Sequence, residues 1–458
     1  MSRLRKSVGV LATLAFVTSL FVLAPTPAQA RHVNCGEITE NTTLTTDFLN
    51  CEGYGLVILE DNITVDLNGH TVSCNNTFPE QVGILLFEVT GVTVQNGTVE
   101  GCDAGVAIEG GGNNTVRRMI ARNNVNDMEE PFAPTGPPPP GSTLADILCN
   151  YGDGIAVNES SNNLIERNWV YGNGPYSGIS LIEEGSDGNI VRNNRVEDNN
   201  LTNLRPQNPE QNSLCGATLP GTPGMQRGRT VQNIGIRIEG PGADNNRVTS
   251  NQVTNNALVG ISIHSYVCNA QPGDPRGDSN PNLHNRIDRN HVSGTGNETV
   301  ELDAFADGIG LLAQGPIGNV TCGSDQNTVS HNVSVDNRRH GISVNRHNDE
   351  NTILRNMAND NDVDGITVAA NAPTEAGPDP FGASDNTLRE NRAANNGRFD
   401  GSDFNPNCDN NAWINNIFIT VNQECVDPDA SVVVPAAAAA SAAAAGDDLS
   451  GMTRSPSS

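Results

Sequence analysis

Three ionisable residues stand directly before glycines that open short apolar stretches: Asp307, His340 and Asp364, with Arg339 beside the histidine. If these stretches are neighbouring strands, the two carboxyl groups lie roughly 9–10 Å apart, a separation that suits inverting glycoside hydrolysis. One acid would protonate the leaving oxygen while one base activates water. Alternatively, the histidine or the arginine acts in β-elimination of a uronic acid, where one group takes the C5 proton and the guanidinium neutralises the carboxylate. Asp-Gly is also ordinary turn chemistry, so a purely structural role stays open.

Polar residues alternate with apolar ones in the same stretches and would point outward beside these groups. The expected substrate-binding residues are Arg237, Glu239, His264, Asn345, Tyr176 and Tyr266. The two tyrosines could stack on sugar rings, and packing at a sheet edge is an equal alternative for them.

A metal site has little support in the sequence. The histidines between His264 and His347 do not share one repeat position, and no CxxC or CxxH spacing occurs, so we expect no preformed metal site and no cofactor. The segment Asp360–Gly365 matches the start of a calcium loop, D-x-D-x-D-G, but Asn371 stands where such a loop needs glutamate. Calcium there stays an open alternative.

A repeated pattern of asparagines indicates the elements that position these residues. Asparagine occupies three fixed positions of a repeat of about two dozen residues, once insertions are set aside, and we call each position a column. The first column holds Asn114, Asn163, Asn189, Asn246, Asn285, Asn327, Asn351 and Asn386. The second holds Asn168, Asn194, Asn251, Asn290, Asn332, Asn356 and Asn391, and the third holds Asn124, Asn173, Asn199, Asn256, Asn337, Asn361 and Asn396. Such a period indicates a stacked repeat protein.

Each repeat opens with Gly-Ile/Val-x-apolar and contains very short runs of alternating apolar and polar residues, which indicate strands. Asparagine would fall at the corners, where it tolerates left-handed backbone and bonds its own main chain, and identical amides would stack into ladders. We therefore predict an all-β, single-stranded parallel β-helix of about ten coils, counted from the opening glycines, with disulfide-stapled ends. A propeller is disfavoured because a blade needs about 40 residues, and helical solenoids are excluded by the lack of a helical period.

The ends differ in composition from the repeats. Residues 1–30 read as a secretory signal with Arg3, Arg5 and Lys6, an apolar run to Leu23 and a small-residue site at Ala28-Gln29-Ala30; an uncleaved anchor is the alternative. Residues 31–426 form the β-helix domain with both caps, and 427–458 form an Ala-rich low-complexity tail. We expect a secreted, extracellular monomer without membrane insertion.

All ten cysteines follow the signal, which fits an oxidising compartment. Repeat position suggests the pairs Cys35–Cys51, Cys74–Cys102, Cys149–Cys215, Cys268–Cys322 and Cys408–Cys425, although sequence cannot prove connectivity.

The net charge of −27 argues against nucleic acid as a partner. Insertions precede the opening strands at 127–150, 202–230 and 297–306, and follow them at 267–282, 316–326 and 371–383. Loops on both edges of one sheet would make a groove for an extracellular polysaccharide; tolerated drift on an exposed corner is the alternative.

Between Cys35 and Cys425, the repeat GIxV-x(n)-NNxI-xxN-x-V-xxN resembles right-handed parallel β-helix proteins of the pectin-lyase-like superfamily, and it is also similar to the β-helix region of NosD-type proteins. The resemblance implies the right-handed sense of the β-helix and a carbohydrate ligand. The chain after residue 30 has no lysine, so a lysine-dependent lyase is excluded, and the polygalacturonase motif set and the DPHE motif of alginate epimerases are missing. Three functions remain: a polysaccharide binder that also cleaves as a lyase or hydrolase, a non-catalytic extracellular scaffold, and a NosD-like copper-pathway accessory protein.

Overall fold

The computed structural model describes residues 35–75, 81–125, 152–174, 176–199, 234–240, 242–265, 281–296, 306–313, 323–345, 347–368 and 382–427. The predicted signal, nearly all of the tail and most of the predicted insertions lie outside these ranges. Within them, no helix is long and apolar enough to cross a membrane.

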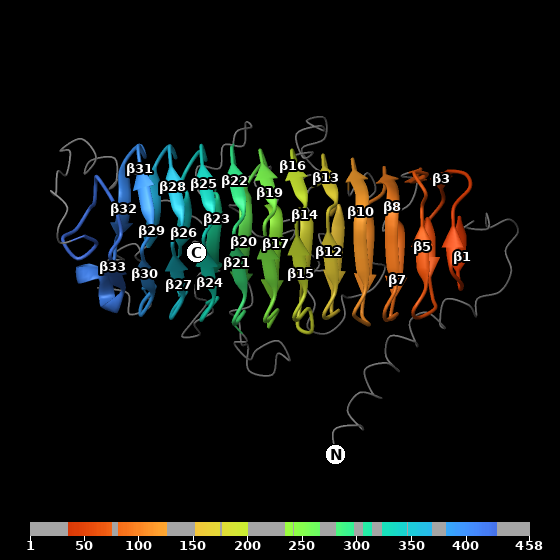
Figure 1. Cartoon of the computed structure of the whole chain (residues 1–458), viewed down its shortest axis with the longest axis horizontal. Coiled ribbons are helices and arrows are strands. Elements are labelled where there is room, and N and C mark those ends of the chain that lie inside the picture. Colours follow the sequence, from red (N-terminus) through yellow and green to blue (C-terminus); the bar gives the residue numbers. More distant parts are fainter. Residues whose placement is uncertain are drawn as a thin grey trace, which may run out of the picture. The chain divides into compact units, whose positions relative to one another are not determined.

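The described chain forms parallel strands that pair with the strand one coil before and one coil after (Figure 1). The first sheet has twelve strands: β1 (Gly36–Ile38), β4 (Leu56–Ile58), β7 (Val82–Phe87), β9 (Ala104–Glu109), β11 (Ile155–Asn158), β14 (Ser177–Ile182), β17 (Ile234–Gly240), β20 (Val259–Ser265), β23 (Ile309–Ala313), β26 (Ile342–Val344), β29 (Asp364–Val368) and β32 (Phe399–Asp403).

Two further parallel sheets complete each coil. The second sheet consists of β2 (Thr42–Thr43), β5 (Thr64–Asp66), β8 (Thr93–Glu100), β10 (Thr115–Arg122), β12 (Leu164–Glu166), β15 (Ile190–Arg192), β18 (Arg247–Thr249), β21 (Arg286–Asp288), β24 (Thr328–Ser330), β27 (Thr352–Leu354), β30 (Thr387–Arg389) and β33 (Ala412–Ile414). The third consists of β3 (Phe48–Cys51), β6 (Thr71–Cys74), the second halves of β8 and β10, β13 (Trp169–Tyr171), β16 (Arg195–Glu197), β19 (Gln252–Thr254), β22 (His291–Ser293), β25 (Val333–Val335), β28 (Met357–Asn359) and β31 (Arg392–Ala394).

The stack confirms the predicted parallel β-helix, and its first sheet has two more strands than the count of opening glycines. The extra strands are β1 and β32, which lie in or beside the segments assigned to the caps. The C-terminal cap is thus partly a further coil, followed by a short 3-10 helix at Pro406–Asn410. Both ends carry the predicted disulfides, Cys35–Cys51 and Cys408–Cys425.

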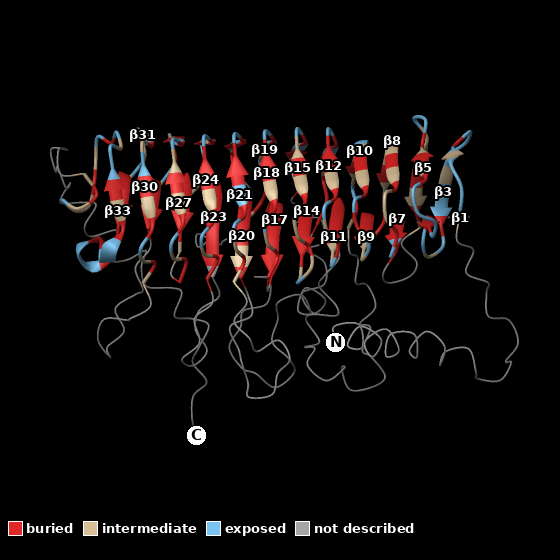
Figure 2. Cartoon of the chain, turned by 60° about the horizontal axis from the view of Figure 1, so that its bottom comes forward, coloured by how far each residue is buried: buried red, intermediate tan, exposed pale blue. Residues whose placement is uncertain are grey.

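Apolar side chains fill a narrow core between the three sheets. The middle residues of successive second-sheet strands, such as Val191, Val248 and Ile287, are fully buried. Figure 2 shows buried residues running along the whole stack, while exposed ones gather at the turns and at the N-terminal end. The third predicted pair within described residues, Cys74–Cys102, joins neighbouring coils. The pairs Cys149–Cys215 and Cys268–Cys322 lie outside the described residues.

The asparagine ladders form as predicted, and they link coils rather than closing local turns. In the second column, the backbone N–H of Asn194 donates to Oδ1 of Asn251 at 2.9 Å, and its Nδ2 donates to the same oxygen at 3.0 Å and to the carbonyl of Ile165 at 2.9 Å. Asn163, Asn189 and Asn246 repeat this backbone contact in the first column. Each amide therefore serves both neighbouring coils.

One local prediction is wrong: the ladder asparagines do not take the left-handed conformation. The residue before each of them does, as at Asn162, Arg167 and Asn193, or a glycine such as Gly172 stands there. The left-handed residue turns the chain outward into solvent. The next residue is then aimed inward, and its amide can bond the adjacent coil instead of its own main chain.

Candidate functional site

The outer face of the first sheet carries ionisable groups that are buried although they point away from the core. Register places Ser180, Arg237, Ser262 and Gly310 in one outward column, and Glu239 and His264 in the next. A β-helix coil needs only apolar and amide side chains to stack, so charged groups buried here call for another explanation.

The first group, which we name the Arg237 cluster, consists of Asp153, Tyr176, Arg237, Glu239 and His264. Arg237 from β17 forms an ion pair with Glu239 two residues on, and its guanidinium lies over the Tyr176 ring at 4.1 Å from the centroid. The Tyr176 hydroxyl donates to Oε2 of Glu239 at 2.5 Å. His264 from β20 places Nδ1 3.6 Å from Oε1 of Glu239. Arg237 is only 1% exposed, whereas the His264 side chain is 25% exposed.

Burial and mutual charge set the protonation of this cluster. Burial has the largest single effect and would raise the pKa of Glu239, but the charge of Arg237 together with the His264, Tyr176 and Arg237 contacts outweighs it and holds this pKa below its ordinary value. Burial lowers the pKa of His264, and Glu239 offsets this only in part. Burial and the Glu239 charge raise the pKa of Tyr176 well above its ordinary value. At neutral pH the cluster therefore holds a charged glutamate, a neutral tyrosine and a neutral histidine.

Asp153 stands two residues before β11, on the coil next to that of Tyr176, and is fully buried. Neither of its oxygens makes a hydrogen bond of good geometry, although Ser180 and the Ser177 backbone lie close enough to lower its pKa. Burial dominates and raises the pKa of Asp153 well above its ordinary value, so this carboxyl is held protonated.

The second group, which we name the Asp364 cluster, brings together the four residues predicted to be catalytic. Asp307 contacts two of the others. Nη1 of Arg339 lies 3.7 Å from Oδ2 of Asp307, and the backbone N–H of His340 donates to Oδ1 of Asp307 at 3.3 Å. The backbone N–H of Asp364 donates to Nδ1 of His340 at 3.3 Å, and the carboxylate oxygen Oδ2 of Asp364 lies 3.5 Å from the same nitrogen.

The two aspartates of this cluster have different surroundings. Arg398 donates two hydrogen bonds to the Asp364 carboxylate, from Nε to Oδ1 at 2.9 Å and from Nη2 to Oδ2 at 2.5 Å. The Ser402 hydroxyl also donates to Oδ2, at 3.0 Å. Asp307 accepts a bond of 2.6 Å from Ser343, and burial raises its pKa. Burial, with the charges of Arg339 and Arg398, lowers the pKa of His340 well below its ordinary value.

Sequence reasoning missed Arg398, although it stands two residues after Asn396 just as Arg339 stands two residues after Asn337. The strand that follows it, β32, has Asp400 where β29 has the opening glycine Gly365, so this coil was not counted. Of the predicted substrate-binding residues, Arg237, Glu239, His264 and Tyr176 come together; Asn345 directly follows β26, apart from them, and Tyr266 lies outside the described residues. The predicted loop walls of the groove also fall mostly outside these residues.

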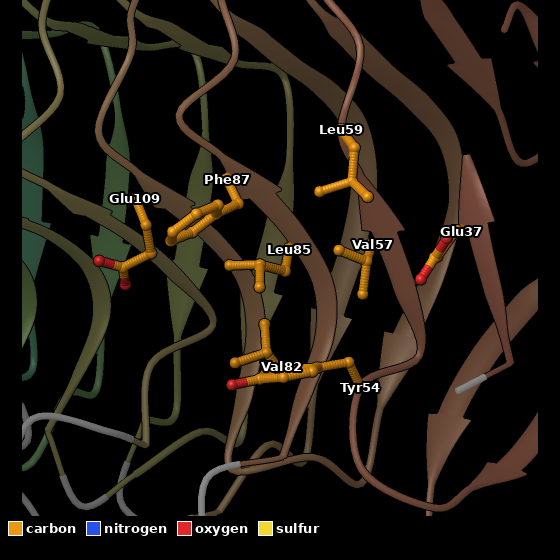
Figure 3. Close-up of a pocket in the computed structure, with 8 residues that line it drawn as sticks. All are labelled: Glu37, Tyr54, Val57, Leu59, Val82, Leu85, Phe87 and Glu109. Carbon is orange, nitrogen blue, oxygen red and sulfur yellow. The ribbon is translucent and has the colours of Figure 1, made fainter. Parts of the chain in front are cut away.

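The N-terminal coils carry a hollow of about 490 Å³ on the same outer face (Figure 3). Its floor is apolar, with Val57, Leu85 and Phe87 side by side, and Tyr54 closes one edge. Glu109 lines it as well; burial raises the pKa of this carboxyl to about 7, and Asn158 donates to it at 2.9 Å. The sequence contained a feature that could have predicted this hollow: apolar residues occupy outward positions in the stretches GLVIL and GILLF.

The calcium motif folds as part of the repeat. Asn361 belongs to the third ladder, where Asn337 donates to its Oδ1, and the Asp364 carboxylate pairs with Arg398. Calcium binding at this segment stays a prediction. In the described ranges, no group of three or more His, Cys, Asp or Glu side chains is placed to hold a metal ion.

The family model described as the right handed beta helix region matches residues 32–272, more than half of the chain. The chain belongs to this β-helix family. A second model, the periplasmic copper-binding protein NosD, matches residues 313–433 of the β-helix protein. No curated protein is significantly similar to it in sequence.

Solved structures with a similar chain path are distant in sequence. The A-module of the Azotobacter vinelandii mannuronan C-5 epimerase AlgE6 is 12% identical with a TM-score of 0.44, over 84% of this chain and 83% of that one. Pectate lyase Pel9A is 12% identical with a TM-score of 0.41, over 78% of each chain. The catalytic domain of a GH87 α-1,3-glucanase is 14% identical with a TM-score of 0.46, over 85% and 63%. At these identities the likeness does not extend to function.

Proposed function

We propose that this β-helix protein is exported, binds an extracellular polysaccharide along the outer face of its first sheet, and cleaves it by acid–base chemistry at His264. The observation that carries the proposal is the position of His264: it is the partly exposed member of a cluster whose other members are buried and hold one another. Perturbed titratable groups gathered on one face are typical of functional sites.

The cost of burial supports a functional reason for the Arg237 cluster. Taking a guanidinium and a carboxylate out of water costs several kcal/mol per ion, and their attraction repays this cost only with good geometry. On other coils the position equivalent to Arg237 is occupied by a small residue, namely Ala107, Ala156 or Ser262. Arg237 and Glu239 are therefore not required for stacking.

The geometry gives His264 a defined role. A charged Glu239 favours the tautomer that carries hydrogen on Nδ1, and in this tautomer Nε2 is the nitrogen that accepts a proton. Arg237 and Tyr176 fix Glu239 and act through it, since Arg237 is itself inaccessible. The proton taken by Nε2 comes either from C5 of a uronic acid, so that a C4–C5 double bond forms as the C4–O bond breaks, or from a water that attacks the glycosidic carbon as its bond to the leaving oxygen breaks. In both routes the leaving oxygen takes up a proton, which the protonated His264 can return.

The Asp364 cluster is the second candidate for the chemistry on the same face. Its histidine is less accessible, and its Asp364 carboxylate is already committed to Arg398. The N-terminal hollow fits a binding role, because Tyr54 and Phe87 offer ring faces and Glu109 offers a polar contact beside them.

The purified protein should be incubated with uronate and neutral polysaccharides, and products read as new reducing ends and as absorbance of unsaturated sugars. His264→Ala should abolish product formation while leaving retention on the glycan. His70→Ala is the matched control, since the His70 side chain is similarly exposed, at 28%, and lies in the turn between β5 and β6, away from this face. Full activity of His264→Ala would overturn the catalytic part of the proposal, and no retention on any glycan would overturn the binding part.

A copper-pathway role is the second candidate, favoured by the NosD match over residues 313–433. The test is copper content after incubation and extensive dialysis. Copper retained at a fixed ratio, with thermal stability lost on chelation, would support this role and count against the polysaccharide proposal if no glycan binds. A scaffold function predicts glycan retention without any product.

A further inference from the structure

The three corners of the coil differ in charge. The corner between the first and second sheets carries acidic residues, including Asp187, Asp244, Asp325, Asp349 and Asp385. The corner between the third and first sheets carries Asp198, Asp336, Asp360 and Asp362 together with Arg338, Arg339 and Arg398. The corner between the second and third sheets is the exception, because arginine predominates there.

We name this third corner the arginine ridge. From β12 to β31, together with the outward positions of the strands on either side of it, it comprises the basic residues Arg167, Arg192, Arg195, Arg247, Arg286, Arg289, Arg355, Arg389, Arg392, His291 and His331. Four carboxylates lie among them, those of Glu166, Glu197, Asp288 and Glu390. Nine arginines against four carboxylates leave this strip positive in a protein whose net charge is −27.

Asp288 organises the middle of the ridge from a fully buried position. Arg289 donates to Oδ2 of Asp288 at 2.9 Å, and Arg247 from the preceding coil donates to the same oxygen at 3.2 Å. Arg286 donates to Oδ1 at 3.2 Å. Burial would raise the pKa of Asp288, but the bonds and charge of Arg286, with Ser330 and Arg247, lower it, so it stays ionised.

The three guanidinium groups around Asp288 remain accessible: the side chains of Arg247, Arg286 and Arg289 are 43%, 46% and 58% exposed. One carboxylate cannot neutralise three cations. Each guanidinium carries five N–H donors, most of which stay available for a second anion. A buried carboxylate thus pre-orients a set of cations toward solvent.

The ridge runs along the stack, so its charges repeat at about the coil spacing of 4.8 Å. Near its N-terminal end, Trp169 is 37% exposed and packs between Arg195, at 5.1 Å, and Tyr171, at 4.5 Å between ring centroids. An accessible indole beside a row of guanidinium groups matches a linear polymer that has both ring faces and regularly spaced anionic groups.

We propose that the arginine ridge binds a linear anionic polysaccharide through its carboxylate or sulfate groups, on a surface separate from the first sheet. Nucleic acid is the less suitable polyanion. Its charge density, about one negative charge per 1.7 Å of duplex, would meet stronger repulsion from the acidic corners and from the net charge. The ridge therefore anchors the protein on an acidic glycan and leaves the first sheet free.

The test is binding of labelled polygalacturonate and dextran sulfate at several salt concentrations, with neutral dextran and duplex DNA as further probes. The variant is the double substitution Arg289→Asn and Arg355→Asn. Both residues have a left-handed backbone, with φ of 56° and 53°, and Asn193 occupies the same repeat position with φ of 55°, so the fold tolerates it. The control is Arg338→Ser, which makes a charge change of the same sign outside the ridge, at the corner between the third and first sheets, where Nη1 of Arg338 donates to the carbonyl of Gly296.

We expect the double variant to bind the anionic glycans at least about tenfold more weakly and with a shallower salt dependence, since fewer ions are exchanged on binding. Arg338→Ser and His264→Ala should bind as the parent protein does. Equal binding by the double variant, or salt-independent binding of neutral dextran, would overturn the proposal. Tighter binding of duplex DNA than of either glycan would assign the ridge to nucleic acid instead. Because His264 is not involved, this outcome is independent of the first-sheet activity.

Discussion

Glu239 and His264 face each other across two neighbouring strands of the first sheet, with Nδ1 of the histidine 3.6 Å from Oε1 of the glutamate. The pair stands in one outward column of the repeat, and Arg237 and Tyr176 approach Glu239 from the other side. This arrangement resembles a positioned base with its orienting carboxylate, and it rests on a buried charge pair whose removal has a measurable cost.

Glu239→Gln should destabilise the protein by about 3–5 kcal/mol, because it leaves the Arg237 guanidinium buried without a counter-charge. The double variant Arg237→Met, Glu239→Leu should be close to the parent protein in stability, because it removes both charges and keeps the volume. Denaturant unfolding of the three proteins measures this. The exposed pair Arg122–Glu100 is the control: Glu100→Gln should change stability by less than about 1 kcal/mol.

The ladders should be as important for stability as the apolar core. Asn251→Ala removes the oxygen that accepts both the backbone N–H and Nδ2 of Asn194. Each buried donor left unpaired costs roughly 1–3 kcal/mol. The adjacent Gln252 is exposed, so Gln252→Ala should stay within about 0.5 kcal/mol of the parent protein. Equal unfolding midpoints for the two variants would show that the ladder bonds contribute little.

Glu109 should make stability fall as pH rises. Its pKa is raised from 4.5 to about 7 by burial, so between these values the folded protein binds more protons than the unfolded chain. The free energy of unfolding therefore falls as pH rises through this window. The full pKa difference corresponds to about 3 kcal/mol, and we expect a smaller change because solvent reaches part of the side chain.

The comparison of unfolding midpoints at pH 5 and pH 8 isolates this effect. Glu109→Gln can still accept the bond from Asn158 and should flatten the pH dependence, with its gain in stability confined to pH 8. A parent protein that is more stable at pH 8 than the Gln variant would contradict the raised pKa.

The asparagine columns and opening glycines predicted the coil, the register and three disulfides. They could do so because residues one repeat apart in the sequence lie next to each other on neighbouring coils. The same logic placed Glu239 next to His264, and Asp307, His340 and Asp364 on successive coils. It could not find Arg398, which bonds Asp364, because the strand after Arg398 has Asp400 in place of the opening glycine. Nor could it tell that Arg237 is inaccessible, because exposure depends on packing around the sheet and not on alternation.

The two aspartates predicted to share a reaction should respond in opposite ways to neutralisation. Asp364→Asn leaves the Arg398 guanidinium, which is 11% exposed, without its carboxylate, and should cost about 3–5 kcal/mol of stability. Asp307→Asn keeps an acceptor for Ser343 and removes a carboxyl whose pKa burial raises, so it should leave stability unchanged or higher at neutral pH. Unfolding midpoints and product formation, measured on both variants, then separate two roles. Loss of activity in the stable Asp307→Asn protein would assign that carboxyl to the chemistry, whereas unchanged activity would leave His264 as the reacting group.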